Sequence, residues 1–188
     1  MNVKAAQSEK MTQQVISATL KIIRESGVKD VTVRRVAEEL GGSTTVVTHY
    51  FANRGVLLES VVSDWISATK HDAQSAIDNS DDKLWGFLVW SISPEHQVFW
   101  QEFFAAHMAG IDTEIFNEIE QFLTWWDEQL LMLLNDRVKP GRNVLEVSDI
   151  IGVVIEGLLF SGSRSLPSGL GHEELLKITI EPLLVKLK

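Results

Sequence analysis

Apolar residues recur along this chain at intervals of three and four, the spacing that places side chains on one face of an α-helix. Between residues 9 and 26 this pattern includes Met11, Val15 and Ile22, and Gly27 follows as a stop signal. No stretch shows the strict apolar-polar alternation of a half-buried strand. The pattern therefore predicts an all-α fold.

The same spacing, together with capping residues at the ends, predicts the other helices. Thr32 and Ser43 are expected to cap two short helices, and Pro94 begins a later one. Pro182 lies inside the last predicted helix, where a kink is expected. The predicted helices cover residues 9–26, 33–40, 44–51, 53–78, 82–92, 94–109, 112–137, 146–163 and from 172 onward.

The charge of the chain is unevenly distributed. The formal net charge is −9, but residues 1–60 carry eight Lys and Arg against six Asp and Glu, a net charge of +2. The remaining residues therefore carry a net charge of −11. A mildly basic segment joined to an acidic one is compatible with phosphate contact on one face, so the acidic total does not argue against DNA binding.

The composition excludes several kinds of site. The absence of Cys excludes disulfides, thiolate metal sites and cysteine nucleophiles. The five His residues are too far apart for a local metal-ligand spacing, so no metal or cofactor is expected. No Ser-His-Asp spacing or phosphate-cradling glycine loop occurs, and no enzyme activity is expected. The N-terminus lacks the apolar core of a signal peptide and no apolar run is long enough to span a bilayer, which favours a cytoplasmic protein.

The segment from Val33 to Phe51 meets the requirements of a helix-turn-helix motif. Two helices that cross near a right angle need a small residue at the close approach, a glycine in the turn and apolar inner faces. Ala37 and Gly41 meet the first two requirements. The expected apolar contacts are Val36, Leu40, Val47 and either Phe51 or Tyr50.

The outward face of the second helix of this motif carries short polar side chains. Threonine hydroxyls and methyls and a histidine imidazole can contact base edges and phosphates. The alternative is a helical hairpin with a polar solvent face, since glycine turns between short helices are common. The candidate base-reading residues are Thr44, Thr45, Thr48 and His49.

The sequence TVRRVAEELGGSTTVVTHYFANRGVLLESVV, with VISATLKIIRESG before it, resembles the DNA-binding domain of the TetR family of bacterial transcriptional regulators. The shared elements are a first helix closed by Glu-x-Gly, a Thr before the second helix, Val-Ala then Gly at the turn, and a polar helix ending in His-Tyr-Phe. That ending is most similar to the BetI-like branch of the family. Gly42 and Thr45 depart from the usual residues at their positions, and Thr45 is expected to shift base preference.

The resemblance implies functions for further residues. Thr32 and Arg34 match phosphate-contacting positions, and Tyr50 matches an aromatic position that contacts a phosphate. Arg54 replaces the usual lysine at the start of the fourth helix and keeps its positive charge. Arg35 is as consistent with a solvated surface charge as with a DNA contact.

The resemblance also implies an order of domains. Residues 1–52 are expected to form a three-helix DNA-binding domain that contains the helix-turn-helix motif. Residues 53–188 are expected to form a helical domain for ligand sensing and dimerisation.

The C-terminal helices predict a homodimer. A helix that is apolar on nearly all sides must be buried on both sides, and residues 146–163 leave only a thin polar stripe. The family resemblance likewise implies a four-helix bundle across a twofold axis. The alternative is a monomer with a thick core. The residues assigned to the interface are Gly152, Gly157, Ser161, Leu176, Ile180 and Leu183.

Aromatic residues are concentrated between residues 55 and 145 and predict a small-molecule site. Large rings in a helical bundle can line an apolar cavity, although each ring taken alone is also consistent with plain core. Glu102 and Glu156 add the option of a cationic ligand, because a carboxylate beside aromatic rings suits a cation. The candidate ligand-binding residues are Trp65, Trp90, Trp100, Phe103, His107, Trp126 and Glu156.

These patterns together predict a ligand-responsive DNA-binding regulator. A small apolar, aromatic or cationic effector is expected to release a repressor from a palindromic operator. Two alternatives stay open: a helical small-molecule-binding protein, and a ligand-independent regulator that acts through a protein partner. Deleting residues 1–55 separates a regulator from a carrier, because only the regulator loses its activity with that segment.

Overall fold

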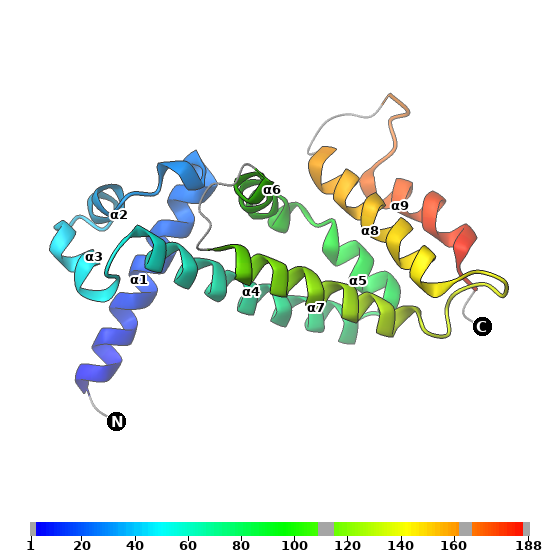
Figure 1. Ribbon diagram of the computed structural model, residues 1–188, viewed down its shortest axis with the longest axis horizontal. Helices are drawn as coiled ribbons and strands as arrows, with labels where there is room; N and C mark the ends of the chain where they lie inside the picture. The colour runs from blue at the N-terminus through cyan, green and yellow to red at the C-terminus, as the bar shows by residue number, and fades with distance from the viewer. Residues whose placement is uncertain (1–2, 109–114, 162–166, 186–188) are drawn as a thin grey trace. The chain divides into compact units, whose positions relative to one another are not determined.

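The computed structural model describes residues 3–108, 115–161 and 167–185 (Figure 1). In these ranges the regular elements are α-helices and short 3₁₀ turns, with one isolated antiparallel bridge between Val138 and Leu184, and the all-α prediction is confirmed. The α-helices are α1 (Val3–Ser26), α2 (Val33–Glu39), α3 (Thr44–Tyr50), α4 (Arg54–Asp78), α5 (Lys83–Ser91), α6 (Pro94–Met108), α7 (Phe116–Leu134), α8 (Val144–Ser161) and α9 (His172–Ile180), and the 3₁₀ turns are η1 (Val28–Asp30) and η3 (Glu181–Leu183).

The chain packs as two compact units, which are described separately. The first unit contains Met1–Ser67 and Glu102–Ile119, and the second contains Ala68–Gln101 and Glu120–Lys188. Helices α4, α6 and α7 therefore contribute residues to both units. The expected boundary between residues 52 and 53 divides the chain by function, whereas these two units divide it by packing. The functional boundary therefore stays a prediction.

The core of the first unit is built on the apolar stripe of α1. Val15 and Ile22 from this stripe are buried, as are Leu57 and Val61 from the first part of α4. Thr19 lies within the same stripe, and its hydroxyl donates to the carbonyl oxygen of Val15 at 2.8 Å. The buried hydroxyl is therefore satisfied, and the spacing of three and four in the sequence corresponds to the packed face.

The second unit combines an apolar core with an ion pair that links two of its segments. Leu88 on α5 and Leu130 on α7 are fully buried. Asp82 caps α5 by accepting a hydrogen bond from the backbone nitrogen of Trp85 at 3.1 Å. Its carboxylate also accepts hydrogen bonds from both terminal nitrogens of Arg137, at 2.6 and 2.8 Å. This bidentate pair joins the start of α5 to the segment after α7.

The end of α9 differs from the expected kinked helix. The α-helix ends at Ile180, and Pro182 lies in the 3₁₀ turn Glu181–Leu183 that follows. Proline has no backbone N–H to bond to the carbonyl four residues earlier, and its ring clashes with that carbonyl. Pro182 therefore stops the helix instead of bending it. None of the described helices is both long and apolar enough to cross a membrane.

Candidate nucleic-acid interface

Helices α2 and α3 form the predicted helix-turn-helix, and their inner faces are buried. Thr32 caps α2 as expected, since its Oγ1 accepts a hydrogen bond from the backbone nitrogen of Arg35 at 3.1 Å. Gly41 in the turn has φ +66°, a conformation that favours glycine. Ser43 precedes α3, but its side chain makes no capping bond. The buried residues of the two inner faces are Val36, Ala37, Val47 and Phe51, whereas Leu40 and Tyr50 are half-buried.

The outer face of α3 is polar and exposed. Thr44, Thr45, Thr48 and His49 are all exposed, and their spacing places them on one side of the helix. The Thr48 hydroxyl donates to the carbonyl oxygen of Thr44 at 3.1 Å, which leaves its oxygen lone pairs and its methyl group accessible. The ring of His49 lies edge-on to that of Tyr50, with 4.9 Å between centroids. The structure thus brings the four candidate base-reading residues onto one accessible surface.

Arg34 lies exposed on α2, the first helix of the motif. Its Nε donates to Glu38 Oε1 at 2.9 Å, one helical turn along, and this hydrogen bond raises the pKa of Arg34. Exposed pairs of this kind contribute little to stability. A DNA phosphate can therefore replace Glu38 as the partner at small cost.

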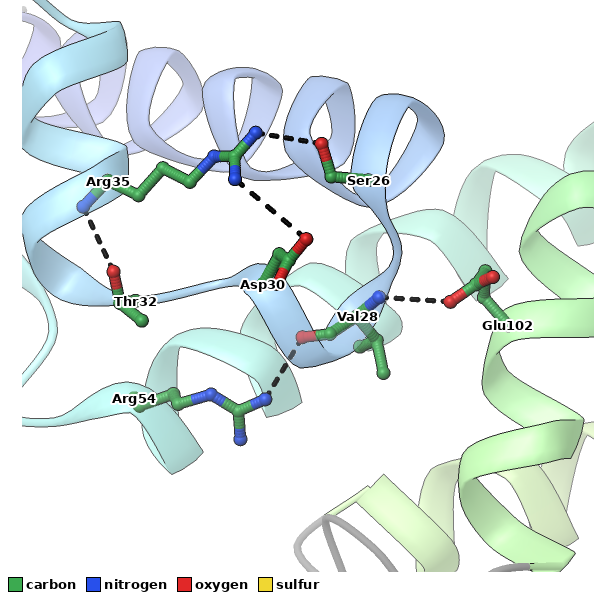
Figure 2. A network of polar contacts seen from close by, with 7 residues as sticks. All are labelled: Ser26, Val28, Asp30, Thr32, Arg35, Arg54 and Glu102. Atoms are coloured by element: carbon green, nitrogen blue, oxygen red, sulfur yellow. Dashed lines mark hydrogen bonds and ion pairs between the residues drawn. The ribbon is translucent and has the colours of Figure 1, made fainter.

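Arg54 makes contacts within its own unit that the sequence did not predict. Its Nε donates to the carbonyl oxygen of Val31 at 2.7 Å. Its Nη2 donates to the carbonyl oxygen of Val28 at 3.0 Å (Figure 2). The half-buried guanidinium therefore holds the segment that leads into α2. A phosphate contact of Arg54 stays a prediction, but the positioning contacts are present without DNA.

A second arginine in the same network ties α2 to the end of α1. Arg35 Nη2 donates to the hydroxyl of Ser26 at 2.7 Å, and Nη1 lies 3.9 Å from Asp30 Oδ2 (Figure 2). Of the two readings of Arg35, the surface-charge reading gains support because the side chain already has partners within the unit. Residues of α1, η1, α2 and α4 thus share one polar network around the start of α2.

Glu102 completes this network, and sequence reasoning did not assign it there. Its Oε2 accepts a hydrogen bond from the backbone nitrogen of Val28 at 3.0 Å (Figure 2). Glu102 was considered as a partner for a cationic ligand, but its carboxylate is used on this backbone group. The two residues are 74 positions apart, so no local pattern could have revealed the contact. Within the first unit, Glu102 of α6 therefore supports the entry to the helix-turn-helix.

A substitution at Gly27 tests the contact between Glu102 and Val28. Gly27 has φ +87°, and an added Cβ would lie 2.7 Å from Glu102 Oε2. Gly27→Ala is expected to lower the free energy of unfolding by about 2 kcal/mol, through backbone strain and displacement of Glu102 from Val28. Urea unfolding followed by circular dichroism measures the change.

The matched control for Gly27→Ala is Gly141→Ala. Gly141 has φ +86° with nothing within 4 Å of an added Cβ, so it reports backbone strain alone, about 1 kcal/mol. In a Glu102→Ala background, Gly27→Ala should cost less than in the otherwise native protein, because the carboxylate that an added Cβ would displace is absent. An equal cost in the two backgrounds would contradict a role for the Glu102 contact.

The candidate ligand-binding residues do not form one cluster within a single unit. Trp65 and Phe103 belong to the first unit, where both are buried with their ring centroids 5.3 Å apart. His107 lies in α6, but its side chain is outside the described residues. These two buried rings pack against each other as part of the core.

The other candidate ligand-binding residues belong to the second unit. Trp90 and Trp126 each lie 5.5 Å from Phe87, measured between ring centroids. Trp126 Nε1 donates to the hydroxyl of Ser91 at 3.0 Å. Trp100 is buried against Phe122 with 5.9 Å between centroids, whereas Glu156 is exposed. Among the residues that the structure describes, no group of three His, Asp or Glu side chains could hold a metal ion.

Helices α8 and α9 lie next to each other (Figure 1), and both carry exposed apolar residues. Val153 is 70% exposed on α8 and Ile178 is 58% exposed on α9, with Ile150 and Phe160 on the same side of α8 as Val153. An added Cβ at Gly152 or Gly157 would meet nothing within 4 Å, so the surface around these glycines is open. We call the exposed residues Ile150, Val153, Phe160 and Ile178 the apolar α8–α9 face.

The interface expected from the sequence needs a correction. Leu176, Ile180 and Leu183 are buried inside their own unit, because α9 and the η3 turn after it place these side chains in the core. Ser161 is half-buried, and its hydroxyl oxygen lies 2.9 Å from His172 Nε2, which links the end of α8 to the start of α9. On α8 and α9, Gly157 and the apolar α8–α9 face are exposed, and Gly152 is half-buried.

Comparison with known proteins is consistent with this geometry. Residues 15–61 match the family described as bacterial regulatory proteins, tetR family. A segment of 61 residues is 39% identical to the HTH-type transcriptional regulator BetI of Escherichia coli O139:H28. That match covers 32% of this chain and 31% of the length of BetI, so the similarity is confined to about a third of each protein.

Solved structures resemble the chain over nearly its whole length. A putative transcriptional regulator from Saccharomonospora viridis, solved in complex with choline, has a TM-score of 0.82 at 14% identity, covering 95% of this chain and 100% of its own. A TetR transcription regulator from Haloarcula marismortui has a TM-score of 0.76 at 16% identity, covering 94% of this chain and 100% of its own. At these identities the neighbours show the shared fold.

Proposed function

We propose that this chain is a DNA-binding transcriptional regulator of the TetR family, whose model matches residues 15–61. The exposed polar face of α3 carries the proposal. Thr44, Thr48 and His49 are accessible there, while Val47 and Phe51 hold the helix on its neighbours. Short donors, acceptors and methyl groups on a helix of this kind suit the edges of bases in the major groove.

The proposed regulator binds a palindromic operator as a homodimer. A single helix-turn-helix contacts few phosphates, and two copies related by a twofold axis read two half-sites. The apolar α8–α9 face supports this assembly, because exposed apolar patches on a surface mark interaction sites. The open surface at Gly152 and Gly157 allows a partner helix to approach closely.

The proposed regulator is a repressor that a small effector releases from its operator. The tryptophans of the second unit support an effector site, and a neighbour of the same fold was solved with choline bound. An effector changes DNA affinity only if it binds one conformational state better than the other. The coupling is therefore measurable as a change in operator affinity at saturating effector.

Substitutions on α2 and α3 test the DNA-binding proposal. Thr48→Ala and His49→Ala are expected to change which sequences are bound, with about 1–3 kcal/mol at each affected base pair. Arg34→Ala is expected to weaken binding to all sequences and to lower the salt slope by about one, because it removes a phosphate contact. Electrophoretic shifts on DNA from upstream of the protein's own gene, repeated on base-substituted fragments and at several salt concentrations, measure both effects.

Two controls sharpen this test. Thr48→Val keeps the methyl group and the shape of the side chain, so it separates methyl contacts from hydroxyl contacts. Arg142→Ala removes an exposed positive charge from the second unit and should leave DNA binding unchanged. If Thr48→Ala, His49→Ala and Arg34→Ala all left binding unaltered, α3 would not be the reading helix.

A further inference from the structure

The second unit contains an open groove to which the proposed function assigns no role. Its volume is about 710 Å³, within the range of organic-ligand sites. Four helices line it: Asp72 comes from α4, Trp85 and Trp90 from α5, Glu95 and His96 from the start of α6, and Glu173 from α9. We call these six residues the acidic tryptophan groove. Of them, only Trp90 was a candidate from the sequence.

The described residues that line this groove include three carboxylates and no Lys or Arg. The three carboxylates, Asp72, Glu95 and Glu173, are exposed at its surface. His96 adds no positive charge near neutral pH, because burial lowers its pKa and outweighs the opposite effect of Asp72 and Glu95. Three carboxylates from three different helices therefore face the same hollow.

The rings of the groove are suited to a cation with an apolar body. Lys177 Nζ lies 5.9 Å from the centroid of Trp85, so this indole already accepts an ammonium group of the chain over its face. Trp90 is half-buried, and its ring lies 5.0 Å from the imidazole of His96. Methylene groups of a ligand can pack on these rings while its ammonium groups pair with the carboxylates.

From this combination we propose that the acidic tryptophan groove binds a linear organic cation with two or more ammonium groups joined by an apolar chain. A single ammonium can pair with only one of the three carboxylates, whereas a ligand with several can pair with more than one. A divalent metal ion is disfavoured, because no three acidic or imidazole side chains in the described residues converge closely enough to coordinate it. The inference deepens the proposed effector response by naming a site and a ligand class, and it rests on the proposed function only for the step from binding to DNA release.

Calorimetric titration of the full chain with spermidine tests the binding directly. One molecule per chain is expected to bind, with an affinity that falls as ionic strength rises, because the carboxylates are exposed to solvent. Two further probes are compared with spermidine. Choline has a single ammonium group, and magnesium chloride supplies a cation without an organic body. Both are expected to bind at least about tenfold more weakly than spermidine, since they form fewer pairs or lose the ring contacts.

Two substitutions place the binding in the groove. The double variant Glu95→Gln with Glu173→Gln is expected to weaken spermidine binding by about tenfold, as two exposed ion pairs are lost. Both residues also lie in the first turn of a helix, where a carboxylate stabilises the helix dipole. Glu174→Gln is the matched control, because Glu174 shares the first turn of α9 but does not line the groove. Circular dichroism and urea midpoints verify that each variant is folded.

The results separate this inference from the DNA-binding proposal. The titrations contain no DNA, so their failure leaves the assignment of α3 intact, and a failure of the electrophoretic shifts leaves the groove intact. Binding of spermidine that the double variant does not weaken would overturn the site. Choline binding as tightly as spermidine would overturn the requirement for more than one ammonium, and magnesium binding as tightly would overturn the organic cation.

Discussion

Val153→Glu is expected to convert the proposed homodimer into a monomer and to weaken binding to a palindromic DNA site by about 100-fold or more. Val153 is 70% exposed in the isolated chain, so a glutamate there costs the fold little. In a symmetric interface the same residue comes from both copies, and two charges would be buried in an apolar contact. Sedimentation equilibrium measures the mass, and electrophoretic shifts measure the loss of cooperative binding to the paired half-sites.

Met132→Glu is the control for this prediction. Met132 is 61% exposed on α7 in the same unit, and it does not belong to the apolar α8–α9 face. The same change of charge and polarity there should leave both mass and DNA affinity unaltered. A Val153→Glu protein that stayed dimeric would show that the two copies meet through another surface.

Asp82→Ala is expected to lower the free energy of unfolding by about 3 kcal/mol. The substitution removes the cap of α5 and both carboxylate oxygens that pair with Arg137. The Arg137 side chain is only 16% exposed, so its positive charge would remain largely buried without its partner. Urea unfolding followed by circular dichroism measures the loss. Asp81→Ala, at the exposed neighbouring position, should change stability little.

The effect of Asp82 depends on pH in a defined direction. The hydrogen bond from Arg137, against the opposing effect of burial, holds the pKa of Asp82 below its ordinary value of 3.8. A folded-state pKa below the unfolded one means that the stabilisation is present above pH 3.8 and is lost as the pH falls through the lower folded-state value. Native protein and Asp82→Ala should therefore converge in stability at strongly acidic pH. Asp82→Asn keeps a capping oxygen and should lose less than Asp82→Ala at neutral pH.

The helix-turn-helix was predictable almost residue by residue. Gly41 has the positive φ that the turn requires, Thr32 caps α2, and Val36 and Val47 are buried. These features depend on neighbours within a few positions, which is the range over which turn chemistry and helical periodicity act. The choice between Phe51 and Tyr50 was left open because both are aromatic and adjacent, and packing buried Phe51.

Contacts between distant positions were not predictable in the same way. Glu102 bonds Val28 across 74 positions, and a helical pattern around Glu102 contains nothing that distinguishes this role from exposure to solvent. The interface residues were misassigned for a related reason. A helix that is apolar all round does not reveal which side meets its own core, so Leu176 and Ile180 were assigned to the partner although they are buried within the chain.

The sequence by itself determined the helices, the turn between α2 and α3, and the polar outer face of α3, because these follow from short-range spacing and from the residue types at helix ends. Only the tertiary structure decided which carboxylates gather beside Trp85 and Trp90, since Asp72, Glu95 and Glu173 come from three separate helices. It also decided which apolar side of α8 stays open. Both outcomes depend on how helices pack against one another, and hydrophobic periodicity specifies that a face is buried without specifying its neighbour.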